Sequence, residues 1–220
     1  MVARELISNA IPPIKTSDTV QKVFDRMAEF RVAHMPIVDD NLLVGVISDE
    51  DLIEVQDYST LVGDVNLSLS NAFVSEGQHI YDVIREFDEK RLTLVPVVDE
   101  SRNYMGVISI NTMMEYVASV TSVKEPGGII VLEINNRNNS LSHISQIVES
   151  NNAQILSSYI TSFADSTRLE VTLKVNRYDL SAIVASFIRY DYTVLSTFND
   201  LKADNAVVGR YDQLMNYLNL

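Results

Sequence analysis

The sequence contains no cysteine, which excludes disulfide bonds, thiolate chemistry and cysteine-ligated metal sites. Positive charge is also scarce, because 17 Lys and Arg stand against 30 Asp and Glu, a formal net charge of −13. Binding to nucleic acid or to an anionic membrane needs a surplus of basic residues that displaces phosphate counterions. We therefore expect neither nucleic acid nor a membrane as a partner.

Long apolar runs are missing as well. No stretch approaches the ~18 apolar residues that span a bilayer, and residues 1–15 lack the apolar core of a signal peptide. Apolar residues nevertheless make up 46% of the 220 positions, enough for a substantial core. The composition favours a cytoplasmic protein of one large or two ordinary domains.

The sequence also lacks the common signatures of catalysis. It has no Gly-x-Ser-x-Gly elbow, no phosphate-binding loop and no dinucleotide fingerprint. The three histidines are scattered without the spacing of metal ligands: His34, His79 and His143. We expect a protein that is not an enzyme and that holds no metal or resident cofactor.

An internal repeat organises the first half of the chain. The segment Met35–Asp39 recurs as Val95–Asp99, and Gly45–Ser48 recurs as Gly106–Ser109. The second copy has one extra residue between these anchors, as a surface turn would allow. Apolar residues at helical spacing precede each copy: Val20, Val23, Phe24 and Met27, then Ile80, Val83, Ile84 and Phe87.

Each copy therefore predicts an amphipathic helix, two short strands and a second helix. In the first copy the helix is expected to open at Asp18, the strands to cover 35–38 and 43–47, and the second helix to start at Ser48. Its counterpart in the second copy starts at Ser109. Two units this small would bury their sheet faces against one another.

The second half follows a different pattern after a turn-rich joint at Lys124–Gly128. Its order is strand, helix, strand, strand, helix, strand, the split βαβ arrangement. The expected strands cover 129–134, 155–163, 169–175 and 192–198, with helices around Ile144 and Ile183. The final residues, 201–220, predict a loop and an amphipathic helix that docks either on its own chain or on a partner.

The repeats resemble the CBS domain, which occurs in tandem as a Bateman module, and the second half resembles an ACT domain. The resemblance implies an α+β chain in which a CBS pair precedes a ferredoxin-like βαββαβ domain. The expected boundaries are CBS repeat 1 at 1–60, CBS repeat 2 at 61–122, an ACT-like domain at 125–200 and the C-terminal segment at 201–220.

The CBS resemblance implies a site for an adenosine-containing ligand at Ser48 and Asp51. In such repeats the carboxylate accepts both ribose hydroxyls, and the serine and nearby amides reach the 5′ side. The same Ser-x-x-Asp pattern is also an N-terminal capping box, so the residues alone leave both roles open. The other repeat would supply most of the purine wall: Val46, Asn71, Ala72, Leu92, Thr93 and Leu94.

The second copy implies a weaker site at Ser109 and Thr112. A threonine hydroxyl can make one bond to a ribose, whereas a carboxylate makes a charge-assisted pair. We therefore expect one competent site and one weak or empty site. The walls of the second cleft would be Ile11, Pro12, Ala33 and His34.

Local charge narrows the expected ligand. The stretch from Asp39 to Asp57 holds seven acidic residues and no Lys or Arg. A triphosphate there would face repulsion unless a cation intervened. AMP, adenosine or S-adenosylmethionine is therefore favoured over ATP.

The ACT resemblance implies an amino-acid site in the loop after the first strand of that domain, at Asn138, Asn139, Ser140 and Leu141. Asn139 stands where the family has a glycine, so its side chain would crowd a ligand, and dimerisation or signal output is the favoured role. The leading hypothesis is a homodimeric regulatory sensor of an adenosine compound. An ACT-type amino-acid sensor with the CBS pair as scaffold, or a ligand-free oligomerisation module, are the alternatives.

Overall fold

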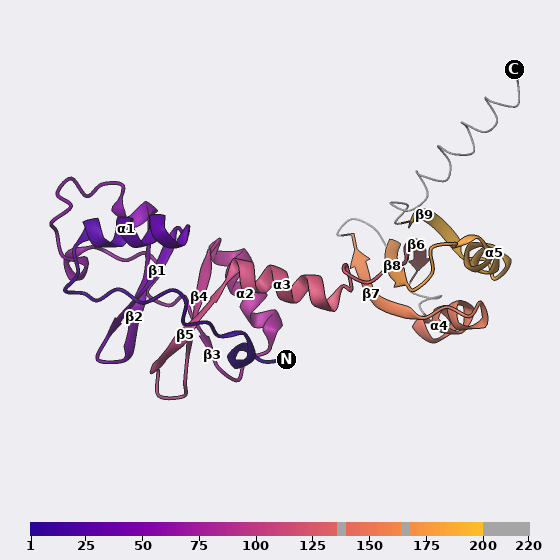
Figure 1. The fold of residues 1–220 in the computed structure, drawn as a ribbon, viewed down its shortest axis with the longest axis horizontal. Helices are drawn as coiled ribbons and strands as arrows, with labels where there is room; N and C mark the ends of the chain where they lie inside the picture. The colour runs from indigo at the N-terminus through magenta and orange to yellow at the C-terminus, as the bar shows by residue number, and fades with distance from the viewer. Residues whose placement is uncertain (136–139, 164–167, 200–220) are drawn as a thin grey trace, which may run out of the picture. The chain divides into compact units, whose positions relative to one another are not determined.

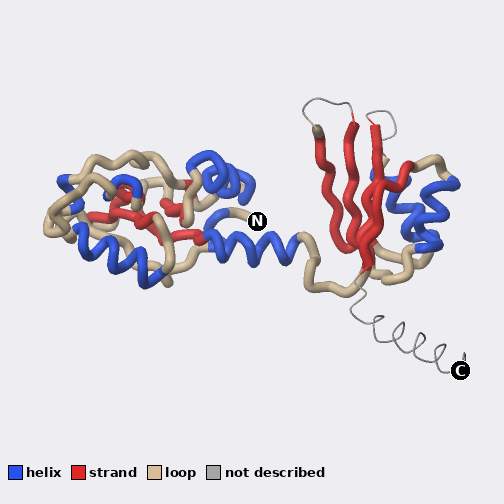
Figure 2. The backbone as a smooth tube through the Cα atoms, turned by 90° about the horizontal axis from the view of Figure 1, so that it is seen from above, coloured by secondary structure: helices blue, strands red, loops and turns tan. Residues whose placement is uncertain are grey.

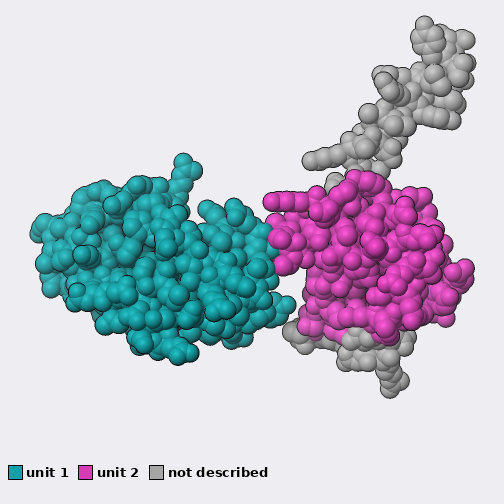
Figure 3. Space-filling model, turned by 60° about the horizontal axis from the view of Figure 1, so that its bottom comes forward, with its two compact units in different colours: residues 1–116 teal, residues 117–220 magenta. Residues whose placement is uncertain are grey.

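A computed structural model describes residues 1–135, 140–163 and 168–199. The chain forms two compact units, Met1–Tyr116 and Val117–Leu220 (Figure 3). The division falls a few residues before the Lys124–Gly128 joint. In the described part of the chain, no helix is both long enough and apolar enough to cross a membrane.

The first unit contains the two repeats with the same order of elements (Figure 1). Each has a helix, an antiparallel hairpin and a helical segment after the second strand. In repeat 1 these are α1 (Val20–Phe30), β1 (His34–Asp39), β2 (Leu42–Ser48) and a 3₁₀ turn (Glu50–Leu52). In repeat 2 they are α2 (Ile80–Lys90), β4 (Leu94–Val98), β5 (Tyr104–Ser109) and α3 (Ile110–Val120).

The two amphipathic helices end in the same way. Arg31 and Arg91 take left-handed conformations with φ of 54° and 51°, and their backbone N–H groups donate to carbonyls of the last turn. The start of α1 differs from the prediction. Its N-cap is Thr19, whose Oγ1 accepts from Lys22 N at 3.4 Å, while Asp18 accepts from Lys15 N at 2.9 Å in the preceding turn.

The prediction of a second helix in repeat 1 is wrong, because only the 3₁₀ turn Glu50–Leu52 forms there. In repeat 2 the corresponding helix, α3, has 11 residues and buries Met113. Repeat 1 buries Leu52 at the position equivalent to Met113, but the next residue, Ile53, is 77% exposed. Asp57 then accepts from both the backbone and the hydroxyl of Ser59, which closes a turn.

The segment that leads into each repeat begins on the other repeat. In the first leading segment (residues 1–14), Ser8 exchanges backbone bonds of 2.8 and 3.1 Å with Val107 in β5. In the second (residues 61–75), Leu69 O accepts from Val46 N in β2 at 3.2 Å. Each segment then joins its own repeat, where Ile14 pairs with β1 and the short strand β3 (Val74–Ser75) pairs with β4 in parallel.

This crossing mixes the two hydrophobic cores. The cluster built mainly from repeat 2 includes Ala3 and Val46. The cluster built mainly from repeat 1 includes Val62, Leu94 and Val107. Because apolar burial is the main driving force for folding, each repeat depends on the other for part of its core.

The second unit is a ferredoxin-like domain, as its order of elements predicted. All its strands pair antiparallel in the order β7-β8-β6-β9, and both helices lie on one face of the sheet (Figure 2). The elements are β6 (Gly128–Asn135), α4 (Leu141–Ser150), β7 (Ile155–Ser162), β8 (Arg168–Val175), α5 (Ser181–Arg189) and β9 (Thr193–Asn199). Residues 129, 131, 172 and 174 point to the face without helices.

Replacing Gly106 by alanine is expected to lower the free energy of unfolding of the first unit by about 1–3 kcal/mol. Its φ is +139°, and a Cβ would lie 2.6 Å from Ile7 Cγ2 and 2.7 Å from Asn9 Oδ1 in the crossing segment. Gly77→Ala is the matched control, because a Cβ there meets nothing within 4 Å. Urea unfolding checks both variants, and equal midpoints would contradict the steric argument.

Candidate functional site at the seam of the two repeats

The two hairpins present their serine-led turns beside the start of their own first strands. His34 at the start of β1 is the register partner of Ser48, and Leu94 at the start of β4 is the partner of Ser109. We define the seam as Ala33, His34 and Thr93 together with the turns Ser48–Asp51 and Ser109–Thr112. All predicted serine and ribose-binding positions lie in it.

Direct hydrogen bonds join the repeats at the seam. Thr93 Oγ1 accepts from Ala33 N at 3.1 Å, and His34 Nδ1 accepts from Thr93 N at 3.3 Å. The Thr93 hydroxyl also lies 3.0 Å from the same Nδ1. An Nδ1 that accepts carries no proton, so this imidazole is neutral. Residues expected in the walls of two different clefts therefore contact one another.

Each serine-led turn is fixed to this contact. Asp49 N donates to Ala33 O at 2.9 Å, and Ile110 N donates to Thr93 O at 3.0 Å. Ala33 and Thr93 occupy equivalent positions in the two repeats, so the two tethers are related by the duplication. The two turns are thus connected through Ala33 and Thr93, which contact one another.

The capping box predicted as one role of Ser48-x-x-Asp51 is formed. Asp51 Oδ2 accepts from Ser48 N at 2.9 Å, and Ser48 Oγ accepts from Asp51 N at 3.1 Å. Asp51 Oδ1 accepts in addition from Ser68 N at 3.2 Å. Nothing in the local sequence pattern identified Ser68, because it reaches Asp51 only through the crossing of the second leading segment.

The second copy repeats the turn without a carboxylate. Ser109 Oγ accepts from Thr112 N at 3.1 Å and lies 3.0 Å from Thr112 Oγ1. The two turns thus share a backbone geometry and differ in charge. The difference in charge expected from the sequence therefore lies between Asp51 and Thr112, which occupy equivalent positions in the two turns.

Two groups at the seam have shifted pKa values. Burial alone would raise the pKa of Asp51, but the hydrogen bonds from Ser48 and Ser68 outweigh it and hold that pKa below its ordinary value. Asp51 is therefore ionised at neutral pH. Burial lowers the pKa of His34, and the nearby carboxylates of Asp49, Glu50 and Asp51 oppose this only in part.

The apolar wall residues divide between the two cores. Val46, Ala72 and Leu92 share one buried cluster, as a common purine wall for the Asp51 site would require. Leu94 is placed otherwise, because it packs in the other cluster with Ile11, a residue expected in the second cleft.

Two other residues expected in the walls of the clefts are Asn71 and Pro12. Asn71 O accepts from Lys90 Nζ at 2.8 Å, and that ammonium also pairs with Glu86 at 2.6 Å. Pro12 is half-buried beside Ile11.

The expected amino-acid loop of the second unit is described only in part. Asn138 and Asn139 lie outside the described residues, as do residues 201–220. Ser140 is the N-cap of α4 and accepts from His143 N at 3.3 Å. Leu141 begins that helix and is exposed. The described part of the loop thus performs helix capping.

Comparisons with known proteins concern mainly the first unit. The family model "CBS domain" matches residues 3–58 and 62–119. An inosine-5′-monophosphate dehydrogenase of Halalkalibacterium halodurans is 29% identical over 116 residues, which is 51% of this chain and 24% of that protein. The chain spans about a quarter of the length of the inosine-5′-monophosphate dehydrogenases it matches.

Solved structures show similar coverage. A CBS domain pair/ACT domain protein from Thermotoga maritima is 26% identical, covers 53% of this chain and 96% of its own, and has a TM-score of 0.49. CBSX2 in complex with AMP is 23% identical, covers 54% of this chain and 97% of its own, and has a TM-score of 0.47.

Acidification from pH 7.5 to 5.5 is expected to destabilise the protein through His34. The pKa of His34 in the folded protein lies below the ordinary 6.5. The stability that the neutral imidazole contributes is therefore fully present above pH 6.5. It is lost as the pH falls below 6.5, because only the unfolded chain takes up the proton. The slope cannot exceed about 1.4 kcal/mol per pH unit.

Urea unfolding across this pH range measures the effect. His34→Asn keeps an acceptor near the Nδ1 position and cannot titrate, so its stability should fall less steeply. Carboxyl groups, with ordinary pKa values of about 4, titrate below this range. Parallel pH profiles for the two proteins would show that His34 is not the titrating group.

Proposed function

This chain belongs to the CBS domain family, and from that premise we propose that its two repeats form a non-catalytic regulatory module that binds one adenosine-containing ligand at the Ser48–Asp51 turn. The bound state is passed to the second unit, which we take to be an ACT-like domain, or to a partner protein. A homodimer is the proposed working form.

The observation that carries the proposal is an ionised carboxylate held in a fixed position at the seam. The backbone N–H groups of Ser48 and Ser68 donate to Asp51, and the side chains of both serines also form hydrogen bonds that lower its pKa. In the proposed complex the vicinal hydroxyls of a ribose take the places of the two serine side chains. The capping box and ribose binding are therefore compatible, and the cap holds the carboxylate in place before a ligand arrives.

The surroundings of Asp51 suit a nucleoside. In the proposed complex the purine lies against the apolar cluster of Val46, Ala72 and Leu92, which is buried in this structure. The Ser48 hydroxyl and the amides of the following turn lie on the 5′ side of such a ligand. Asp49 and Glu50 are exposed there, and residues 39–57 include no Lys or Arg. Their charge disfavours a triphosphate, so AMP, adenosine or S-adenosylmethionine is the proposed class.

The seam provides a route from ligand to output. A ligand that binds one arrangement of the repeats more tightly shifts the population toward it. α3 begins at Ile110, whose N–H is bonded to Thr93 O, and it runs through the boundary between the two units. A change at Thr93 therefore acts on the helix that connects the module to its output domain.

Asp51→Asn is expected to weaken binding of the adenosine ligand at least about tenfold, because the amide offers one uncharged acceptor oxygen in place of two charged ones. The measurement is the ligand-induced shift in melting temperature with AMP, adenosine, S-adenosylmethionine and ATP. At about 100 times Kd the parent protein gains roughly 2.7 kcal/mol. Each variant is compared with its own ligand-free melting temperature, so loss of the cap cancels.

Asp49→Asn is the matched control, since it removes an exposed charge two residues before Asp51. It should keep the shift with AMP. A shift that survives Asp51→Asn, or that appears only with amino acids, would contradict the proposed site.

Thr112→Asp is expected to raise the stoichiometry from one to two ligands per chain, because it restores the Ser-x-x-Asp pattern on the existing turn of repeat 2. Isothermal titration calorimetry with the best ligand of the series measures it. Asn111→Asp adds the same charge at the neighbouring position and should leave one site. Unchanged stoichiometry in Thr112→Asp would show that the carboxylate is not the deciding group.

A further inference from the structure

The helix-free face of the second unit contains a hollow of about 390 Å³. One row of register partners crosses all four strands on this face: Ser157, Lys174, Ile129 and Phe198. Thr172 and Tyr159 form part of the next row. The chain leading into β6 borders the hollow, because Ser157 Oγ donates to Thr121 O at 2.8 Å. The hollow is comparable in size with small-molecule sites.

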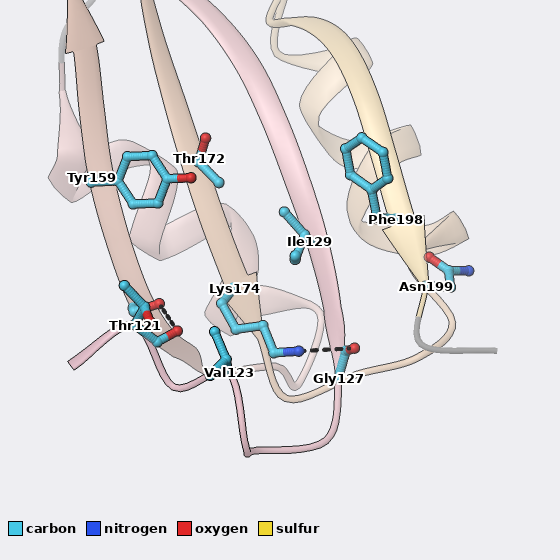
Figure 4. A pocket seen from close by; sticks show the side chains of 10 residues that line it. Thr121, Val123, Gly127, Ile129, Tyr159, Thr172, Lys174, Phe198 and Asn199 are labelled. Atoms are coloured by element: carbon cyan, nitrogen blue, oxygen red, sulfur yellow. Dashed lines mark hydrogen bonds between the residues drawn. The ribbon is translucent and has the colours of Figure 1, made fainter. Parts of the chain in front are cut away.

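Lys174 is the unusual member of this row. It lies in the second of the four paired strands of the row, in β8, and is only 9% exposed. Its ammonium has three donors, and the bond described for it is a long one, to Gly127 O at 3.3 Å (Figure 4). Among the ion pairs of the described residues, none involves Lys174. A buried cation without an anion is costly, so the site is incomplete without one.

The rest of the lining is apolar or carries hydroxyl groups, apart from the amide of Asn199. The rings of Tyr159 and Phe198 are 54% and 57% exposed, and Ile129 lies between Lys174 and Phe198 in the row. The Tyr159 hydroxyl points toward Thr172 (Figure 4). None of the described lining residues is an Asp or Glu. The nearest acid on the same face of β8 is Glu170, four residues along the strand, or about 13 Å away.

We propose that this hollow binds a small monocarboxylate with an apolar body, the carboxylate on Lys174 and the body over Ile129, Tyr159 and Phe198. A single ammonium balances one negative charge, whereas a phosphate dianion would leave one charge uncompensated in an apolar site. An α-amino acid would bring an ammonium group that finds no carboxylate in the described lining. The site is separate from the seam of the repeats and does not depend on the adenosine proposal.

Three matched probes test this assignment by isothermal titration calorimetry. 3-Phenylpropanoate has the proposed chemistry, 3-phenylpropanamide removes its charge, and phenylalanine adds an α-ammonium group. The acid should bind saturably with one site per chain and at least about tenfold more tightly than either other probe. Equal affinity of acid and amide would overturn the role of Lys174. Equal affinity of phenylalanine would overturn the ligand class.

Lys174→Met keeps the length of the side chain and removes the charge. It should bind acid and amide equally, while its ligand-free melting temperature stays level or rises, because a buried unpaired charge is gone. If the role of Lys174 were purely structural, Lys174→Met would instead lower the melting temperature and leave the preference for the acid over the amide intact. That result would overturn the proposal. Lys124→Met, an exposed lysine outside the lining, should keep the parent's preference.

A measurement on the unmodified protein does not depend on how any variant folds. In a sample with ¹³C-labelled isoleucine methyl groups, 3-phenylpropanoate should shift the signal of Ile129. The signal of Ile144, which lies on α4 and packs in the core, should stay unchanged. No shift at Ile129 under saturating acid would overturn the location. Asp51→Asn should not alter this binding, which separates it from any effect at the seam.

Discussion

The first unit depends on the crossing of each leading segment onto the other repeat. Ser8 pairs with Val107 and Leu69 with Val46, so neither hairpin has a complete set of neighbours within its own repeat. The crossing carries Ala3 and Val62 into the opposite cores. It also brings Ser68 to Asp51. The same constraint that makes the two repeats fold together therefore shapes the carboxylate that is proposed to bind the ligand.

Duplication preserved the backbone of the seam and changed its side chains. The tethers from Asp49 to Ala33 and from Ile110 to Thr93 are equivalent, yet one turn holds a carboxylate and the other a hydroxyl. The bond between Thr93 and His34 has no counterpart related by the duplication. The equivalent residues are Ala33 and Leu94, and neither has a polar side chain. Equivalent tethers that carry different side chains are the basis of the proposal that the module has one preferred site.

The second unit uses one sheet for two purposes. Alternate residues of β6 and β8 bury Ile130, Leu132, Val171 and Leu173 under the helices, which provides the stability. The opposite residues need not form a core, and there Lys174 lies between Ser157 and Ile129. A buried charge of this kind reduces stability, and natural proteins retain such costs mainly where function uses them.

The sequence by itself determined the duplication, the first helix and the hairpin of each repeat, and the βαββαβ order of the second unit, because helix and strand periodicities are local properties of two to four residues. It also located Ser48, Asp51 and the asymmetry with Thr112, since these stand at fixed offsets from the strand. It failed for the second helix of repeat 1 and gave no indication of the contact between Ser68 and Asp51. Only the tertiary structure decided these, and the burial of Lys174 and His34, because each depends on which distant segment lies alongside, and no local pattern encodes that.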